Sequence, residues 1–395
     1  MQADEDIRSI LRRTPPGVPA FSPDLERVVR RARARRIRKG LVAGLAVAVL
    51  GMGVAVPLAL LGRLGGAADR GPAGSIGVPV LLERIRVESG AVALAVGEDG
   101  VWVAGFNRVA RIDPGTNEVL AMIRTPGTGD YSAVAVGEGG VWVTASRGLV
   151  YRIDPARNSV AATIEIGEYP QDIAVGGGWV WVTRAAAGPG DLVRIDPRTD
   201  RVAGAPINLG YGPGPLVFFD GSLWVATTGL TVGELTEPND FEGPTMVQVD
   251  TVSGEVFPVG GPPGAPDASG AGAVWGVAFG ELLAPGTVGG DAVIRVDPDA
   301  ARVTAVIAVE RAQEVAVGEG VVWVMTTPPS TDPKLFIPER GHPGTVVVID
   351  PATNSPVGDP LPVRGLQPID LATGEGSAWV ADYTDGTVTR VGLEG

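Results

Sequence analysis

The sequence contains no cysteine and only one histidine, His342, in 395 residues. The absence of cysteine excludes disulfide bonds, thiolate metal sites and a cysteine nucleophile, and it is compatible with either redox compartment. The chain also lacks a nucleophile elbow, a P-loop and the helical motif of zinc proteases. A lone histidine between Gly341 and Pro343 is more typical of a solvated loop than of a catalytic base. These absences favour a binding role over an enzymatic one.

The charge of the chain is unevenly distributed. Residues 1–39 carry eleven Lys/Arg and five Asp/Glu, a net +6, whereas the remainder carries 21 against 40, a net −19. The acidic bulk of the protein should repel nucleic acid, so we expect no DNA or RNA partner. Glycine (58) and proline (34) are abundant, but 45% of the residues are apolar, which indicates a turn-rich chain with enough material for a large core.

One apolar run is long enough to cross a bilayer. After Gly40, the 22 residues Leu41–Gly62 carry no charge. At a rise of about 1.5 Å per residue they extend about 33 Å, against a hydrocarbon layer of roughly 30 Å. Seven arginines and Lys39 lie within the thirteen residues Arg27–Lys39, and such basic clusters stay on the cytoplasmic side. We therefore expect a single-pass protein of the cell membrane with its N-terminus in the cytoplasm.

Two alternatives to this anchor are a cleaved signal peptide and a buried core helix. Gly66-Ala67-Ala68 resembles a cleavage site, but the basic leader and the apolar run are both too long for a signal peptide. A core helix of this length without a polar face would need complete burial. The tail itself predicts a juxtamembrane helix whose arginines meet anionic lipid, or a helix that docks a cytosolic partner.

The rest of the chain repeats one sequence motif seven times. Each unit consists of a small-apolar strand, a glycine turn, a strand of V-W-V type, an I-D-P or V-D-P step and a further apolar strand. Successive tryptophans are 40, 39, 43, 51, 48 and 56 residues apart, which is the length of a four-stranded propeller blade with loop insertions. The tryptophans are Trp102, Trp142, Trp181, Trp224, Trp275, Trp323 and Trp379.

This repeat predicts an all-β fold, a seven-bladed β-propeller of four-stranded blades, preceded by one transmembrane helix. The predicted parts are a cytoplasmic basic tail (1–39), the transmembrane helix (40–62), a Gly/Pro-rich linker (63–78) and the extracytoplasmic propeller (79–395). We expect the tryptophans to fill the layers between blades. The aspartates before proline are expected to form Asx turns rather than a metal site.

The ends of the repeat predict how the ring closes. The last unit has strands near Ile369, at Trp379 and from Thr387 to Val391, and then the chain stops without a fourth strand. The segment Val80–Val87 is a strand without a blade of its own. It should supply the missing outer strand and cover the exposed edge.

The glycine turn, the V-W-V strand and the Asp-Pro step, repeated in register over residues 80–395, resemble the YVTN-type propeller repeat and the related virginiamycin B lyase-like and NHL-type propellers. The resemblance implies the propeller fold, and rings of this kind serve as enzymes, scaffolds and sensors. The lyase-like relatives depend on a histidine base with a nearby carboxylate and a metal. No motif around His342 matches that chemistry, so it is not carried over.

A candidate binding face is indicated by four long insertions. In a four-stranded meander, the b–c loops and d–a connections emerge at one end of the ring, and long loops on a rigid scaffold are common binding sites. The insertions are Ala185–Asp191, Gly229–Thr245, Phe279–Asp291 and Thr327–Gly344, and they contain Phe241, Leu335, Phe336, Ile337 and His342. Tyr131, Tyr169 and Tyr211, in consecutive d–a connections, are predicted to form an aromatic rim, with a purely structural role as the alternative.

A candidate metal site is indicated at the same end, where the axial channel opens. The residues nine positions before each tryptophan are Ala93, Ala133, Asp172, Pro215, Pro266, Glu314 and Asp370. Three of these seven equivalent positions are acidic, so Asp172, Glu314 and Asp370 should converge at the channel mouth. Their oxygens suit Ca²⁺ or Mg²⁺, with simple hydration as the alternative.

From the sequence we therefore expect a membrane-tethered extracytoplasmic propeller that acts as a binding or scaffold domain for a protein, a peptide or an envelope polymer. The alternatives are a metal-dependent lyase or hydrolase with its site at the channel mouth, and a sensor that couples the outer domain to the cytoplasmic tail. The repeat leaves the oligomeric state open.

Overall fold

The chain divides into two compact units, Met1–Pro72 and Ala73–Gly395, and a computed structural model describes most of the second. The structure describes residues 76–394 apart from 88–89, 98–99, 127–130, 168, 186–189, 228–244, 263, 279–291, 328–329, 333–336, 339–342, 364 and 366. The predicted tail (1–39) and transmembrane helix (40–62) lie outside this part, as does most of the predicted linker (63–78). No helix within the described ranges is long and apolar enough to cross a membrane.

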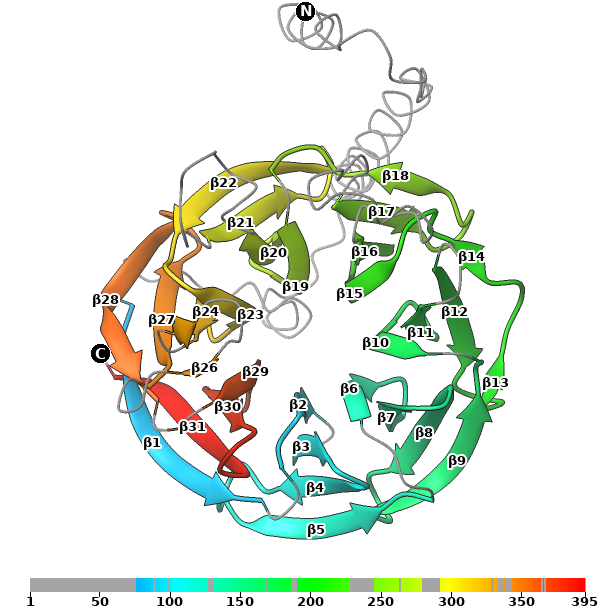
Figure 1. Ribbon diagram of the computed structural model, residues 1–395, viewed down its shortest axis with the longest axis horizontal. Helices are drawn as coiled ribbons and strands as arrows, with labels where there is room; N and C mark the ends of the chain where they lie inside the picture. Colours follow the sequence, from blue (N-terminus) through cyan, green and yellow to red (C-terminus); the bar gives the residue numbers. More distant parts are fainter. Residues whose placement is uncertain are drawn as a thin grey trace, which may run out of the picture. The chain divides into compact units, whose positions relative to one another are not determined.

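Seven antiparallel sheets stand around a common centre, each with its strands ordered from the inside of the ring to the outside (Figure 1). The seven-bladed propeller is thereby confirmed. Blade 1 consists of β2 (Ala93–Gly97), β3 (Gly100–Gly105), β4 (Arg108–Ile112) and β5 (Val119–Arg124). Blade 2 consists of β6 (Tyr131–Gly137), β7 (Gly140–Ala145), β8 (Leu149–Asp154) and β9 (Ser159–Glu165). Blade 3 consists of β10 (Pro170–Gly176), β11 (Trp179–Arg184), β12 (Asp191–Asp196) and an outer strand divided into β13 (Arg201–Val202) and β14 (Ile207–Asn208).

The remaining blades follow the same plan. Blade 4 consists of β15 (Pro213–Phe219), β16 (Ser222–Thr227), β17 (Met246–Asp250) and β18 (Val256–Pro258). Blade 5 consists of β19 (Gly264–Gly270), β20 (Ala273–Ala278), β21 (Ala292–Asp297) and β22 (Arg302–Ala308). Blade 6 consists of β23 (Ala312–Gly318), β24 (Val321–Thr326), β27 (Thr345–Asp350) and β28 (Ser355–Pro362), and a separate hairpin of β25 (Ser330–Asp332) and β26 (Ile337–Pro338) lies in its insertion. Blade 7 consists of β29 (Pro368–Gly374), β30 (Ser377–Asp382), β31 (Thr387–Glu394) and β1 (Val78–Arg86).

The ring closes through β1, as the ends of the repeat predicted. β1 pairs antiparallel with β31, and Ile85 stands opposite Val388 in the register. Because β1 precedes blade 1 in the chain and β31 is the last strand, the two ends of the propeller meet in one sheet. This pairing satisfies the backbone groups of β31 that would otherwise form an open edge.

The seven repeat tryptophans are fully buried, which confirms that they form the core. Each packs against the blade that follows it: Trp102 lies in one cluster with Val134 and Val143 of blade 2, and Trp379 lies with Val101 and Val103 of blade 1. A single sheet has nothing to cover its faces, so the tryptophans stabilise the ring by removing a large apolar surface from water between sheets.

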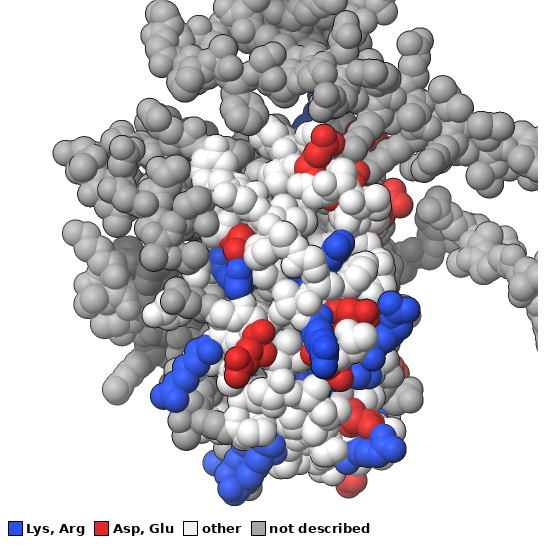
Figure 2. Space-filling view, turned by 90° about the vertical axis from the view of Figure 1, so that its right-hand side faces the viewer, with Lys and Arg blue, Asp and Glu red and all other residues white. Residues whose placement is uncertain are grey.

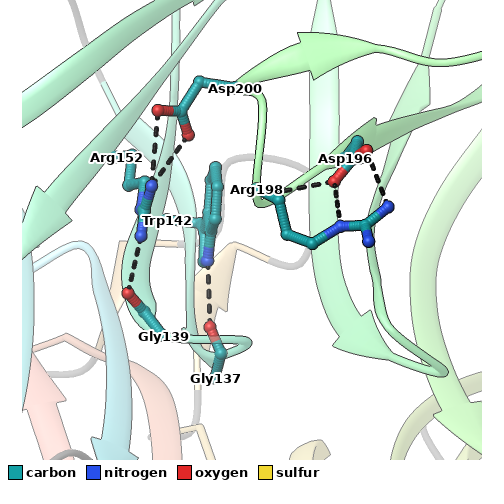
Figure 3. Close-up of polar contacts among 7 residues, drawn as sticks. All are labelled: Gly137, Gly139, Trp142, Arg152, Asp196, Arg198 and Asp200. Atoms are coloured by element: carbon teal, nitrogen blue, oxygen red, sulfur yellow. Dashed lines mark hydrogen bonds and ion pairs between the residues drawn. The ribbon is translucent and has the colours of Figure 1, made fainter.

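Blades 1, 2, 5 and 7 are also fastened to the next blade by an arginine of their third strand. In Figure 3, Arg152 lies beside Trp142, 5.4 Å from the ring centroid, and reaches Asp200 in the c–d turn of blade 3 at 3.1 Å. The Trp142 indole N–H donates to the Gly137 carbonyl at 3.0 Å. This combination explains why the repeat contains Gly, Trp and Arg in register.

The same arginine contact recurs around the ring. Arg111, Arg295 and Arg390 each stack on the tryptophan of their own blade. Each also donates to a carbonyl and an Asn side chain in a c–d turn of a neighbouring blade, and Arg390 does so to Pro114 and Asn117, so that blade 7 is joined to blade 1.

The Asp-Pro steps form Asx turns, as predicted. Asp113 Oδ1 accepts the backbone N–H of Gly115 at 2.7 Å, and Asp154 Oδ1 accepts that of Ala156 at 2.8 Å. Equivalent bonds are made by Asp196, Asp250, Asp297 and Asp350. These carboxylates are occupied by backbone donors, and the end of the ring that carries the a–b and c–d turns is built from short, internally bonded turns.

The outer wall carries charges of both signs. Figure 2 shows the right-hand side of the ring of Figure 1, where basic and acidic side chains lie among uncharged ones. Some of these charges pair within one turn, as Arg157 does with Asp154 and Arg198 with Asp196. Such exposed pairs contribute little to stability because water screens the charges.

Candidate functional site

A cavity of about 360 Å³ lies at the centre of the ring and is lined by the innermost strands of the blades. Its residues lie near the beginnings of these strands: Ala93 is the first residue of β2, Asp172 the third of β10 and Asp370 the third of β29. The d–a connections lead into these strand ends. The cavity therefore opens at the end of the ring that also carries the b–c insertions, where the sequence placed the channel mouth.

Four carboxylates line this cavity. Asp172, Glu314 and Asp370, which the sequence predicted to converge, all do so, and Asp267 of blade 5 joins them. The described residues of the lining include no lysine, arginine or histidine. The convergence of the three predicted side chains follows from the propeller geometry, because equivalent positions of the innermost strands all face the axis.

Asp172 and Asp370 are held by backbone donors from two blades each. Asp172 Oδ1 accepts the N–H of Ile173 and Oδ2 that of Leu216 in blade 4, both at 2.8 Å. Asp370 Oδ1 accepts the N–H of Leu371 at 2.8 Å, and Oδ2 accepts that of Leu94 in blade 1. Both oxygens of each carboxylate are thus occupied, so these two side chains join neighbouring inner strands.

Asp267 reaches the cavity because blade 5 has a different register. Pro266 pairs with Gly276 and Ala268 with Trp275, so Asp267 is the extra residue of a β-bulge, eight positions before Trp275 instead of nine. Gly276 permits this arrangement, since a Cβ there would lie 1.8 Å from the Ala265 carbonyl oxygen. Counting nine residues back from Trp275 gives Pro266, so the fourth acid is missed. The sequence signal for it is the glycine after tryptophan, where the typical repeat has valine.

The environment raises the pKa of all four carboxyl groups. Burial raises the pKa of Asp172 to about 6, against the opposing effect of its amide donors. Burial, together with the charge of Asp172, raises the pKa of Asp370 to about 7. Burial first, and then the charges of the neighbouring acids, raise the pKa of Asp267 and Glu314 well above their usual range. The described lining of the cavity therefore disfavours the ionised form of all four acids, and these acids retain protons more readily than acids in water.

Asp267 and Glu314 differ from the other two acids in how they are bonded. Asp267 Oδ2 is buried and has no hydrogen-bond partner among the described residues. Burial and the neighbouring acids all raise the pKa of Glu314. Each of the other three acids also accepts hydrogen bonds from backbone donors, which lower its pKa. In the described part of the chain, no three acidic or histidine side chains are grouped so that they could hold a metal ion. The predicted Ca²⁺ or Mg²⁺ site at Asp172, Glu314 and Asp370 stays a prediction.

The three rim tyrosines lie at the entrances to consecutive inner strands. Tyr169 precedes β10 and is 66% exposed, Tyr211 precedes β15 and is partly buried, and Tyr131 is the first residue of β6. Ile337 lies in β26, whose backbone pairs with β25. Phe241, Leu335, Phe336 and His342 lie outside the described residues. The aromatic rim and the insertion residues therefore stay predictions.

A second hollow of about 510 Å³ lies where the ring closes, and the sequence did not indicate it. It is bounded by Arg86 at the end of β1, by Val87 and Gly90 after it, and by residues 383–386, the b–c turn of blade 7. Beside it, Phe106 and Tyr383 pack edge to face with centroids 5.8 Å apart, and both are substantially exposed. Because these are b–c turns, this hollow lies at the same end of the ring as the cavity.

Solved structures of other proteins share the fold. No protein-family model and no curated protein sequence matches the chain. Kuenenia stuttgartiensis hydrazine synthase aligns with a TM-score of 0.56 at 14% identity, over 78% of this chain and 97% of that one. The computationally designed Ika8 protein aligns with a TM-score of 0.52 at 14% identity, over 78% and 98%.

A third similar structure is the extracellular domain of the B. thetaiotaomicron protein BT4673. It aligns with a TM-score of 0.53 at 13% identity, over 80% of this chain and 42% of that one. At such identities the likeness extends to the fold alone. It agrees with the propeller that the repeat predicted and leaves the YVTN, lyase-like or NHL affiliation as a resemblance.

Proposed function

We propose that this chain is a membrane-tethered, extracytoplasmic binding domain whose ligand, a protein, peptide or envelope polymer, engages the end of the ring where the inner strands begin. The observation that carries the proposal is the acidic cavity at this end. It is a concave site of a size typical for ligand pockets, about 300–1,000 Å³, on a rigid scaffold.

The two ends of the ring differ in a way that supports this assignment. The end with the a–b and c–d turns consists of tight turns whose polar groups bond to each other. The opposite end carries the cavity, the hollow beside Tyr383 and the exposed Tyr169. Tyrosine side chains are favoured at binding surfaces because they provide a large contact area at a low entropic cost.

The tether is supported by the sequence pattern of residues 1–62, with its basic cluster followed by an uncharged run. One of the proteins of similar fold is also an extracellular domain. Among the described residues, the cavity lining contains no histidine, serine or threonine that could form a hydroxyl nucleophile with a histidine base.

Site-specific photo-crosslinking tests which end binds. The photoreactive residue p-benzoyl-phenylalanine is introduced at Tyr169, and as a matched control at Val252, which is 94% exposed in the c–d turn of blade 4. We expect the full chain in its native membrane to form a discrete crosslinked species from position 169 and none from position 252. Equal crosslinking from both positions, or crosslinking only from 252, would place the ligand at the wrong end for this proposal.

A further inference from the structure

We infer that the cavity takes an organic cation, a primary ammonium or guanidinium group on an alkyl chain, and that Asp267 and Glu314 are the residues that bind its charge. This inference rests on the proposed function and names the chemistry of the ligand at that same site. Such a group belongs either to a small free amine or to a lysine or arginine side chain of a peptide.

The first argument is the charge that the cavity leaves unbalanced. Four carboxylates face one cavity of about 360 Å³, and no described residue of its lining is basic. Two of them, Asp172 and Asp370, have both oxygens bonded to backbone N–H groups of two blades. The other two, Asp267 and Glu314, stand on the adjacent blades 5 and 6, and like charges so close together are unfavourable unless a cation or a proton neutralises them.

The second argument is the unpartnered oxygen of Asp267. Its Oδ2 atom is buried and accepts no hydrogen bond from any described residue, although the side chain lines the cavity. Native structures rarely leave a buried carboxylate oxygen without a donor, because its desolvation then has no compensation. An ammonium or guanidinium group supplies both the missing donor and the missing positive charge.

The bulge that presents Asp267 is itself permitted by one residue. Gly276 stands opposite Pro266, where a side chain would overlap the Ala265 carbonyl. Bulges often redirect a side chain next to a functional site. Here the extra residue turned into the channel is an acid whose Oδ2 atom has no hydrogen-bond partner in the described part of the chain.

The third argument separates an organic cation from a metal ion. No three acidic or histidine side chains of the described residues are placed to ligate one ion. A cavity of about 360 Å³ exceeds the space of a single ion and suits a small molecule or one side chain. Its walls include the apolar residues Leu94, Val134, Ile173, Leu216 and Leu371, against which an alkyl chain packs while its charged end meets the acids.

The raised pKa values make a further consequence measurable. Carboxyl groups whose pKa is raised by burial and by mutual repulsion hold protons at mildly acidic pH. A bound cation favours the ionised form, so binding releases protons and strengthens as the pH rises from about 5 to 8. The groups that face the site and take part are Asp172, Asp267, Glu314 and Asp370.

Isothermal titration calorimetry of the full chain in detergent tests the inference with three probes: spermidine, a capped tetra-arginine peptide, and Ca²⁺. We expect one equivalent of spermidine or of the peptide to bind, with proton release seen as a dependence of the heat on the buffer. Asp267→Asn and Glu314→Gln should each weaken binding about 30-fold or more, as is typical when one partner of a buried charge pair is removed.

Matched controls are Asp359→Asn and Glu165→Gln, which make the same chemical changes on exposed positions of the outer strands β28 and β9. They should leave the affinity unchanged. The near-UV circular dichroism and the melting temperature of each variant check that it folds. If a variant fails to fold, the competition of spermidine with the peptide, and its dependence on pH, still test the site in the parent chain.

The tighter of the two organic probes identifies the source of the cation. The inference is overturned if neither organic probe binds, if Asp267→Asn and Glu314→Gln bind as the controls do, or if Ca²⁺ binds one to one and displaces spermidine. Crosslinking from Tyr169 with no binding of these probes would overturn the ligand class and leave the binding face intact. Binding of a cation without crosslinking from Tyr169 would overturn the binding face and leave the ligand class intact.

Discussion

At the residue scale, equivalent acids of the ring have different roles because their neighbours differ. Asp172 and Asp370 occupy the same position in blades 3 and 7, and each accepts one N–H from its own strand and one from the next blade. Glu314 occupies that position in blade 6 with a side chain one methylene longer. Its carboxylate extends into the cavity, where only repulsion and burial act on its pKa. Side-chain length thus separates an inter-blade contact from a carboxyl group whose raised pKa no backbone donor opposes.

The raised pKa of Asp172 and Asp370 predicts how stability depends on pH. Their folded-state pKa values are about 6 and about 7, against an ordinary aspartate value of 3.8, so the folded chain binds more protons than the unfolded chain between these values. Their contribution to stability is therefore complete below about pH 4 and is lost as the pH rises to about 7. The surface acids Asp154 and Asp196 have a lowered pKa and act in the opposite sense, at lower pH.

Thermal unfolding between pH 4 and 8 measures this effect. The double variant Asp172→Asn/Asp370→Asn should lose less stability across the range from pH 4 to 7 than the parent chain does. Its absolute stability is not the readout, because asparagine has one acceptor oxygen and cannot serve both amides. Parallel pH profiles for the parent and the variant would show that these two groups titrate normally and contradict the prediction.

At the element scale, the blades are not equally connected. The arginine that stacks on tryptophan and reaches a neighbouring blade is replaced by Gln248 in blade 4 and by Val348 in blade 6, at the positions that pair with Trp224 and Trp323. Blade 4 also has Phe219 where other blades have the glycine that accepts the indole N–H, and the Trp224 Nε1 atom is buried without a partner among the described residues. The two irregular blades, 4 and 6, carry two of the longest insertions. The blades that lack the arginine contact are thus blades with long insertions between their second and third strands.

The closing strand β1 supplies a prediction at this scale. Ile85 is buried against blade 1, whereas Leu81 in the same strand is 43% exposed. Ile85→Asp should destabilise the fold by more than about 3 kcal/mol, because it places an unpaired charge in the seam that closes the ring. Leu81→Asp, the matched control, should change stability by about 1 kcal/mol or less.

Urea unfolding followed by tryptophan fluorescence measures both variants. The buried tryptophans make the signal sensitive to separation of the blades, because each lies between two sheets. Equal stability of the two variants would show that β1 is not required for closure.

Individual elements show how far the sequence pattern reaches. The predicted strand Leu149–Ile153 is found as β8, and the predicted outer strand Val160–Ile166 as β9, within one residue at each end. Val80–Val87 pairs with the last strand as expected. By contrast, the insertion after β24 contains a small hairpin, β25 and β26, that no periodicity indicated, because strands of two and three residues are too short to show one.

At the scale of the whole molecule, the location of the propeller is the main prediction. The described part contains no helix that could span a bilayer, so the anchor rests on the sequence of residues 40–62. The absence of cysteine makes a direct test available, since any introduced thiol is the only one in the chain.

Two single-cysteine variants, Val252→Cys in the propeller and Ser9→Cys in the tail, are treated with a membrane-impermeant maleimide. In intact cells we expect labelling at position 252, and at position 9 only after permeabilisation, because arginine clusters resist translocation. Labelling of position 9 in intact cells would reverse the orientation. Recovery of a shortened propeller in the medium would instead identify residues 1–68 as a cleaved leader.

The sequence by itself determined the architecture, because every blade repeats the same apolar pattern and each tryptophan must find a neighbouring sheet to cover it. It also placed Asp172, Glu314 and Asp370 around one channel, since a fixed spacing from tryptophan is a fixed position on the innermost strand. Only the tertiary structure decided that Asp267 is the fourth acid and which acids are bonded. A bulge changes the register by one residue, and the donors come from the adjacent blade, so neither fact can be read within a single repeat.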